Sequence, residues 1–256
     1  MTYRALDADR ILATLERLHL RISERFPDAG LARVCGELLD IASQTQHRAA
    51  QIAKPNLLVR GISMAMIASG IAALIYVASR IIDMKFGENN ISGVMQGIEA
   101  GVSLLIVVGG GILFTSTLEA RWKRGQALED LYELRSIVHV IDMHQLTKDP
   151  SATVGAGTKT DHSPERTMTP FQLMRYLDYC SEMLAITAKL AALYAQSYRD
   201  PIVLETVSDL GQITTNMTNQ IWQKINIIQA TERSTDVTRI LAERRLGQAR
   251  AAKVEA

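Results

Sequence analysis

The sequence predicts an all-α membrane protein, built from a two-helix transmembrane hairpin plus a cytoplasmic helical bundle. Two uncharged apolar blocks, Gly61–Ser79 and Ala100–Leu118, are each long enough to cross a hydrocarbon core of about 30 Å. Elsewhere, apolar residues recur every three or four positions, which is the spacing of one face of a helix. No segment shows the alternating, β-branched pattern bounded by turns that is typical of a strand.

Residues 1–56 predict an N-terminal cytoplasmic helical pair. Asp7 is placed to cap the first helix, and the break at Phe26–Gly30 separates it from the second, which Pro55 ends or kinks. The start of the chain has acidic residues and no apolar core of a cleavable signal, so the first span is expected to direct insertion itself. The predicted apolar stripes are Ile11, Leu15, Leu18 and Ile22, then Leu31, Val34, Leu38, Ile41 and Thr45.

Residues 57–120 predict the transmembrane hairpin, with spans at about 60–81 and 93–118. Lysine and arginine predict its orientation, because they are enriched in cytoplasmic flanks. The connecting loop has Arg80 and Lys85, whereas each outer flank has three basic residues: Arg48, Lys54 and Arg60 upstream, and Arg121, Lys123 and Arg124 downstream. We therefore expect a multi-pass protein of the cell inner membrane with both termini cytoplasmic, and Trp122 as an interfacial anchor.

The rest of the chain predicts more cytoplasmic helix. Residues 121–149 are expected to continue from the second span, 150–168 to form a flexible linker rich in Ser, Thr, Gly and Pro, 169–232 to form a helical hairpin, and 233–256 to form a basic tail or frayed helix. Thr169 and Gln172 match a capping box. The heptad positions are Leu173, Leu177, Cys180, Leu184, Thr187, Ala191, Tyr194 and Tyr198. The residues predicted to line the next helix are Val203, Val207, Leu210, Ile213, Met217, Ile221, Ile225 and Ile228.

Small residues recur at every fourth position in both spans. Gly93, Gly97 and Gly101 form a GxxxGxxxG motif in the second span. Close backbone approach stabilises helix association in lipid, where the hydrophobic drive between helices is small. The motif is therefore a predicted helix-packing site, either within one hairpin or between subunits. The first span supplies the matching residues Ala65, Ser69 and Ala73.

A polar stripe in the second span carries an alternative prediction. Gln96, Glu99 and Ser103 share one face of the helix. A carboxylate within a span is a functional hypothesis by default, and an oligomer could turn this stripe inward to line a cation path. An interfacial position of Glu99, at the outer edge of the span, is the simpler interpretation.

No residue pattern predicts a catalytic, cofactor-binding or metal site. His139 and Asp142 share a helix face, but His144 is turned away from His139, and two ligands do not make a site. Phosphate-binding loops, dinucleotide fingerprints and nucleophile elbows are not in the sequence. A net charge of +1 and 5% aromatic residues argue against a nucleic-acid partner. Cys35 and Cys180 lie at apolar helix positions and are expected to be buried.

These observations favour a non-enzymatic membrane protein that forms a homo-oligomer and presents a cytoplasmic helical scaffold to a protein partner. An oligomeric pore or ion channel is the alternative, and an enzyme with an unrecognised site is the third hypothesis. The layout, with cytoplasmic helices, a two-span hairpin and further cytoplasmic helix, resembles that of two-transmembrane effector domains of the SLATT kind in bacterial defence systems. The resemblance is one of organisation, and it implies a pore-forming effector.

Overall fold

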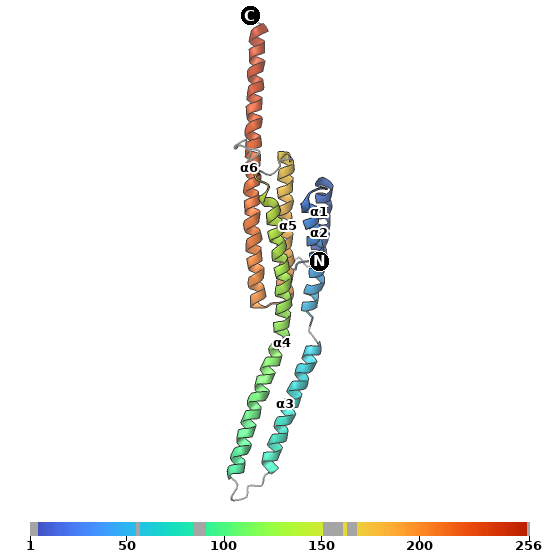
Figure 1. Cartoon of the computed structure of the whole chain (residues 1–256), viewed down its shortest axis with the longest axis vertical. Coiled ribbons are helices and arrows are strands. Elements are labelled where there is room, and N and C mark those ends of the chain that lie inside the picture. The colour runs from blue at the N-terminus through green and yellow to red at the C-terminus, as the bar shows by residue number, and fades with distance from the viewer. Residues whose placement is uncertain (1–4, 55–56, 84–90, 151–160, 163–167, 255–256) are drawn as a thin grey trace. The chain divides into compact units, whose positions relative to one another are not determined.

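The computed structural model is helical, with no strand in the part of the chain that it describes (Figure 1). It describes all residues except 1–4, 55–56, 84–90, 151–160, 163–167 and 255–256. The predicted linker 150–168 and the loop between the spans therefore fall largely outside the described residues. The helices are α1 (Ala8–Arg25), α2 (Gly30–Ile52), α3 (Leu57–Asp83), α4 (Ile91–Leu146), α5 (Pro170–Ser197) and α6 (Pro201–Val254).

The chain divides into two compact units. Residues 1–49 and 129–256 form one, which we call the bundle, and residues 50–128 form the other, which we call the hairpin. The hairpin takes α3 and the first part of α4, and the bundle takes α1, α2 up to Ala49, α5, α6 and the last part of α4. The periodicity predicted that the second span continues as helix, and α4 is indeed a single helix of 56 residues.

The predicted helix starts in the bundle are confirmed. The Asp7 carboxylate accepts a hydrogen bond from the Arg10 amide at the start of α1. At α5, the Thr169 hydroxyl accepts from the Gln172 amide while the Gln172 side chain accepts from the Thr169 amide, which is the predicted capping box. These contacts satisfy amides that have no partner inside the helix.

Helix α5 is the centre of the bundle. It contacts both α1 and α6 and lies between them in Figure 1. Seven of its predicted heptad residues are buried, and the eighth, Tyr198, is half-buried. A second buried stripe that the heptad pattern did not predict covers the neighbouring face, because α5 packs on more than one side. Its members are Tyr176, Tyr179, Met183, Ile186, Leu190 and Leu193.

The other bundle helices bury one stripe each. The four predicted residues of α1 are all buried, and in α2 Ile41 is half-buried while its neighbour Ala42 is buried. In α6 the buried members of the predicted stripe are Val203, Leu210, Ile221, Ile225 and Ile228. Val207, Ile213 and Met217 are half-buried, and Thr214 is buried beside Ile213. The segment after residue 232, expected as a tail or frayed helix, continues α6 to Val254, and residues 233–238 are exposed.

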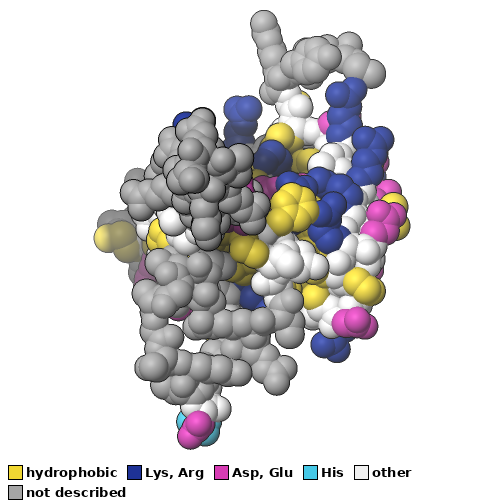
Figure 2. Space-filling view, turned by 90° about the horizontal axis from the view of Figure 1, so that it is seen from above, with side chains coloured by type: hydrophobic (Ala, Val, Ile, Leu, Met, Phe, Trp, Pro, Cys, Tyr) yellow, Lys and Arg dark blue, Asp and Glu magenta, His cyan; other side chains and the backbone are white. Residues whose placement is uncertain are grey.

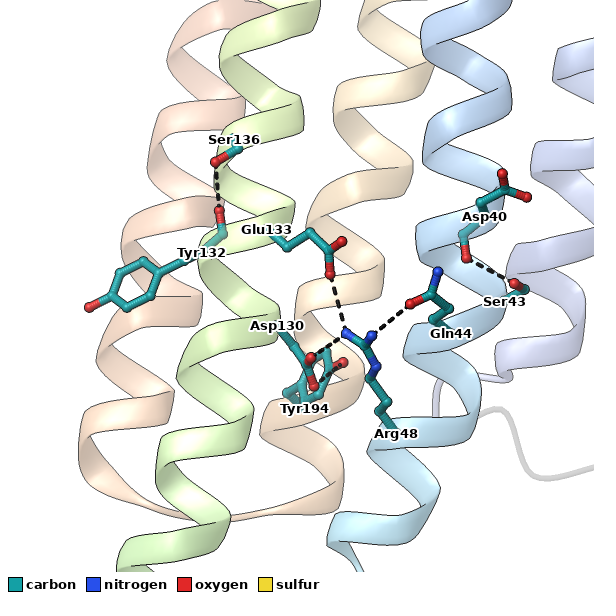
Figure 3. A network of polar contacts seen from close by, with 9 residues as sticks. All are labelled: Asp40, Ser43, Gln44, Arg48, Asp130, Tyr132, Glu133, Ser136 and Tyr194. Atoms are coloured by element: carbon teal, nitrogen blue, oxygen red, sulfur yellow. Dashed lines mark hydrogen bonds and ion pairs between the residues drawn. The ribbon is translucent and has the colours of Figure 1, made fainter.

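One polar network joins three bundle helices (Figure 3). The Arg48 guanidinium of α2 donates to Asp130 of α4 at 2.6 Å, and also contacts Glu133 at 3.2 Å and Gln44. The Tyr194 hydroxyl of α5 donates to the other Asp130 carboxylate oxygen at 2.9 Å. Because Asp130 is buried, these two donors supply the hydrogen bonds that a buried carboxylate needs.

Candidate functional site: the exposed apolar hairpin

The hairpin exposes the apolar side chains that a water-soluble fold would bury. Between residues 57 and 118, Gly70 and Thr115 are the buried positions among those the structure describes. Large side chains along both helices are exposed, with 78% of Leu57, 71% of Val107 and 70% of Leu113 accessible. Burying a side chain of this size is favourable by about 1.5–3 kcal/mol, so this surface is costly in water.

Both helices are long and apolar enough to cross a membrane. The core helix of a soluble protein passes the same test of length and composition, but its apolar residues are buried by its own chain. The apolar residues of α3 and of the first part of α4 are exposed instead. The hairpin therefore needs lipid or another protein surface to cover it.

Within the hairpin, α3 and α4 make their closest described glycine contact at Gly70. A Cβ atom built on Gly70 would lie 2.6 Å from Val108 Cγ1, which is closer than side chains tolerate. One turn away on α3, the Met66 sulfur lies 3.2 Å from the hydroxyl of Thr115, which also donates to the Gly111 carbonyl. Gly70 was not among the predicted packing residues, because it is a single glycine outside the GxxxG spacing.

The predicted glycine motif lies on the half-buried stripe of α4. Gly93, Gly97 and Gly101 are all half-buried, and Gly101 is in heptad register with Val108 and Thr115, which approach α3. Even so, no described atom of another segment lies within 4 Å of a Cβ built on Gly101. The motif thus shares the face that meets α3, but at Gly101 the backbones are not in close contact.

The small residues predicted on α3 do not form a single buried stripe. Ala65 and Ser69 are exposed, and Ala73 is half-buried. The Ser69 hydroxyl donates to the carbonyl of Met66 in its own helix. The α3 side that meets α4 passes through Gly70 instead.

The possible pore stripe is exposed along its length. Gln96, Glu99 and Ser103 all lie on the exposed side of α4. In a lipid-facing position Glu99 would leave a carboxylate without water or a counter-charge, which is costly. The stripe therefore requires either an aqueous position or a second chain against this face.

A basic cluster follows the apolar part of α4. The Lys123 ammonium contacts the Glu119 carboxylate at 3.0 Å and donates to the carbonyl of Lys54 at 2.7 Å. Trp122, the predicted interfacial anchor, is exposed beside it. Ammonium and indole groups at the end of an apolar span are typical of a membrane–water boundary.

The described histidine, cysteine and acidic side chains form no metal-binding group. Among the described residues, no group of three or more His, Cys, Asp or Glu side chains is arranged to hold a metal ion. In the segment 139–144, His139 is exposed and His144 is half-buried. The two histidines are not part of a metal-binding group among the described residues. Cys35 and Cys180 are buried as predicted, and burial raises the pKa of each thiol to about 12, which suppresses the reactive thiolate.

Comparison with protein-family models, with curated proteins and with solved structures found no match to this chain.

Proposed function

We propose that this chain is a non-enzymatic inner-membrane protein that oligomerises through its hairpin and presents the helical bundle to a cytoplasmic protein partner. The observation that carries the proposal is the contrast in exposure between the apolar residues of the hairpin and those of the bundle. In lipid, the apolar side chains of the hairpin can stay exposed at no cost, because the hydrocarbon core covers them. The lysine and arginine bias of the flanks supports the orientation with both termini inside.

Oligomerisation is supported by two features of α4. The surface beside Gly101 has no described atom within 4 Å of the added Cβ, which leaves room for the backbone of another helix. Glu99 lies on the exposed side of the same helix, where contact with a second chain would take it out of lipid. Both features favour association of hairpins over a solitary hairpin.

Presentation to a partner is supported by apolar side chains on the outside of the bundle. Tyr132 and Met143 of α4 and Trp222 and Ile227 of α6 are large, apolar and exposed. Aromatic residues and methionine are enriched at protein–protein interfaces. Residues 233–238 of α6 add an exposed helical segment that a partner could contact.

A pore remains the second candidate function, and the exposed stripe of Gln96, Glu99 and Ser103 is the observation that favours it. In a ring of hairpins this stripe would place one carboxylate per subunit around a shared axis. Such rings select cations. The resemblance to two-transmembrane effectors points the same way.

The oligomeric mass of the detergent-solubilised protein tests the proposal. We expect a discrete oligomer, and we expect Gly97→Leu to shift it toward monomer while the protein stays helical, because a branched side chain would separate packed backbones. Gly125→Leu is the matched control, since Gly125 lies beyond the apolar part of α4 and also has no described neighbour within 4 Å of its added Cβ. A wild-type monomer would contradict both candidate functions.

A further inference from the structure

A pocket of about 420 Å³ opens in the bundle. It lies where the turn between α1 and α2 meets the end of α4 and the start of α5. Pockets that bind small molecules usually have volumes of about 300–1,000 Å³. This pocket is thus larger than an inorganic ion requires. Its polar lining includes Arg25, Asp28, His144, Lys148, Gln172 and Tyr176.

Two cations at the pocket rest on aromatic rings. The Arg25 guanidinium lies 5.6 Å from the ring centre of Phe171, and the Lys148 ammonium lies 5.1 Å from that of Tyr176. In the described part of the chain, neither cation has a carboxylate within ion-pair distance. Asp28 is the acidic residue among the described lining residues, so the lining carries an excess positive charge. Figure 2 looks onto this end of the bundle and shows Lys and Arg side chains gathered on the uncovered part of the face.

His144 is held between the two sides of the pocket. A Cβ atom on Gly30 would lie 2.7 Å from His144 Cε1, so glycine at this position makes room for the imidazole. The Tyr176 hydroxyl lies 3.4 Å from His144 Nδ1. Burial, together with the charges of Lys148 and Arg33, lowers the pKa of His144, so the ring is neutral at pH 7. An anion in the pocket would offset the positive charges of Lys148 and Arg33 and so favour the protonated imidazole of His144.

We propose that this pocket binds a small organic phosphate, with Arg25 and Lys148 neutralising the phosphate and His144 gaining a proton when the ligand binds. A phosphate monoester fits better than a carboxylate because it carries close to two negative charges and three acceptor oxygens. The volume beyond the phosphate accommodates the organic part of the ligand. The proposal rests on bundle residues alone, so its test does not depend on the hairpin being in lipid.

The test is calorimetric titration of the purified full-length protein with ribose 5-phosphate, using ribose as the uncharged control. We expect saturable binding of ribose 5-phosphate and none of ribose. Arg25→Gln and Lys148→Gln should each weaken binding by at least about tenfold, the loss expected when one charge-assisted contact is removed. Arg25→Lys should retain more affinity than Arg25→Gln. Lys189→Gln is the matched control, because Lys189 is an exposed cation of α5 outside the pocket.

Proton uptake provides a readout that a merely structural role would not change. The binding heat should vary with the ionisation enthalpy of the buffer in the direction of proton uptake, and His144→Asn should abolish that uptake. The groups that face His144 are Arg25 of α1, Asp28 of the turn after it, Arg33 of α2, Lys148 just after α4, and Tyr176 of α5. Circular dichroism and thermal unfolding would establish that each variant is folded before its affinity is compared.

The source of the phosphate is distinguished by competition. Vesicles of phosphatidylcholine containing phosphatidic acid should leave ribose 5-phosphate binding unchanged if the natural ligand is a soluble phosphate, and should compete if it is a lipid headgroup. Vesicles of phosphatidylcholine alone are the control. The absence of saturable binding up to the millimolar range would overturn the proposal. Binding that folded Arg25→Gln and Lys148→Gln variants retain in full would overturn it as well.

Discussion

The same side chain has opposite surroundings in the two units of this molecule. In the bundle, Leu177 and Leu184 of α5 are 0% exposed. In the hairpin, Leu105 and Leu113 of α4 are 62% and 70% exposed. The bundle leucines are covered by their own chain, whereas the hairpin leucines depend on what surrounds the molecule. The sequence distinguishes the uncharged helices of the hairpin from the amphipathic helices of the bundle. Exposure in the structure adds that the apolar surface of the hairpin is not covered by its own chain.

The largest expected effect comes from a matched pair of leucine truncations. Leu177→Ala removes a fully buried side chain and should lower the unfolding free energy of the bundle by about 2–5 kcal/mol. Leu105→Ala should change the same quantity by less than about 0.5 kcal/mol, because Leu105 is exposed and belongs to the hairpin. Chemical denaturation followed by circular dichroism measures both. Equal losses for the two variants would contradict the division into a core and a surface.

A polar contact inside the bundle should have the next largest effect. Asp130→Ala leaves the buried Tyr194 hydroxyl without its acceptor and removes the ion pair with Arg48. The expected loss of unfolding free energy is about 1–3 kcal/mol. Glu133→Ala is the control, because its contact with Arg48 is between exposed groups and should contribute about 0–1 kcal/mol. The comparison fails if the control costs as much as Asp130→Ala.

Packing inside the hairpin is tested at Gly70. Gly70→Ala places a methyl group 2.6 Å from Val108 Cγ1. We expect it to destabilise the hairpin by about 1–3 kcal/mol in detergent, because the helices or the Val108 side chain must move to relieve the overlap. Adding Val108→Ala should restore stability, since it removes the atoms in the way. Gly61→Ala should be neutral or stabilising, because its Cβ meets no described atom within 4 Å and alanine favours helix. A double variant no more stable than Gly70→Ala would show that the two helices do not meet there.

The smallest expected effect is a pH dependence of the bundle. The pKa of His144 is lowered in the folded state, so the unfolded state binds its proton at higher pH. Stability from this group is present above pH 6.5, the ordinary histidine value, and declines as the pH falls below it. His144→Asn should remove that part of the slope below pH 6.5. An unchanged slope in the variant would assign the pH dependence to other groups.

The sequence predicted most of the bundle because its signals are local. Caps at Asp7 and Thr169 need only neighbouring residues, and the stripe of α1 follows from helix period alone. The second buried stripe of α5 escaped prediction because it depends on contacts with helices distant in the sequence.

The contacts of the hairpin and the pocket of the bundle were less predictable, because they too join residues that are distant in the sequence. Gly70 and Val108 lie 38 positions apart and follow no repeat, and the pocket gathers Arg25, His144 and Tyr176 from separate segments. Repeats such as GxxxG indicate a face that is able to pack. They do not say which helix packs there, and at Gly101 the α3 backbone is not in close contact.

The central claim is that lipid surrounds the hairpin and water surrounds the bundle, and spin-label accessibility tests it most directly. Labels at Ile106→Cys and Lys189→Cys probe two exposed positions, one in each unit. The native cysteines are buried with raised thiol pKa, which keeps background labelling low. In reconstituted membranes, the label at position 106 should be relaxed by oxygen and shielded from a water-soluble nickel chelate, and the label at position 189 should show the reverse. Equal relaxation of both labels by the chelate would contradict the account.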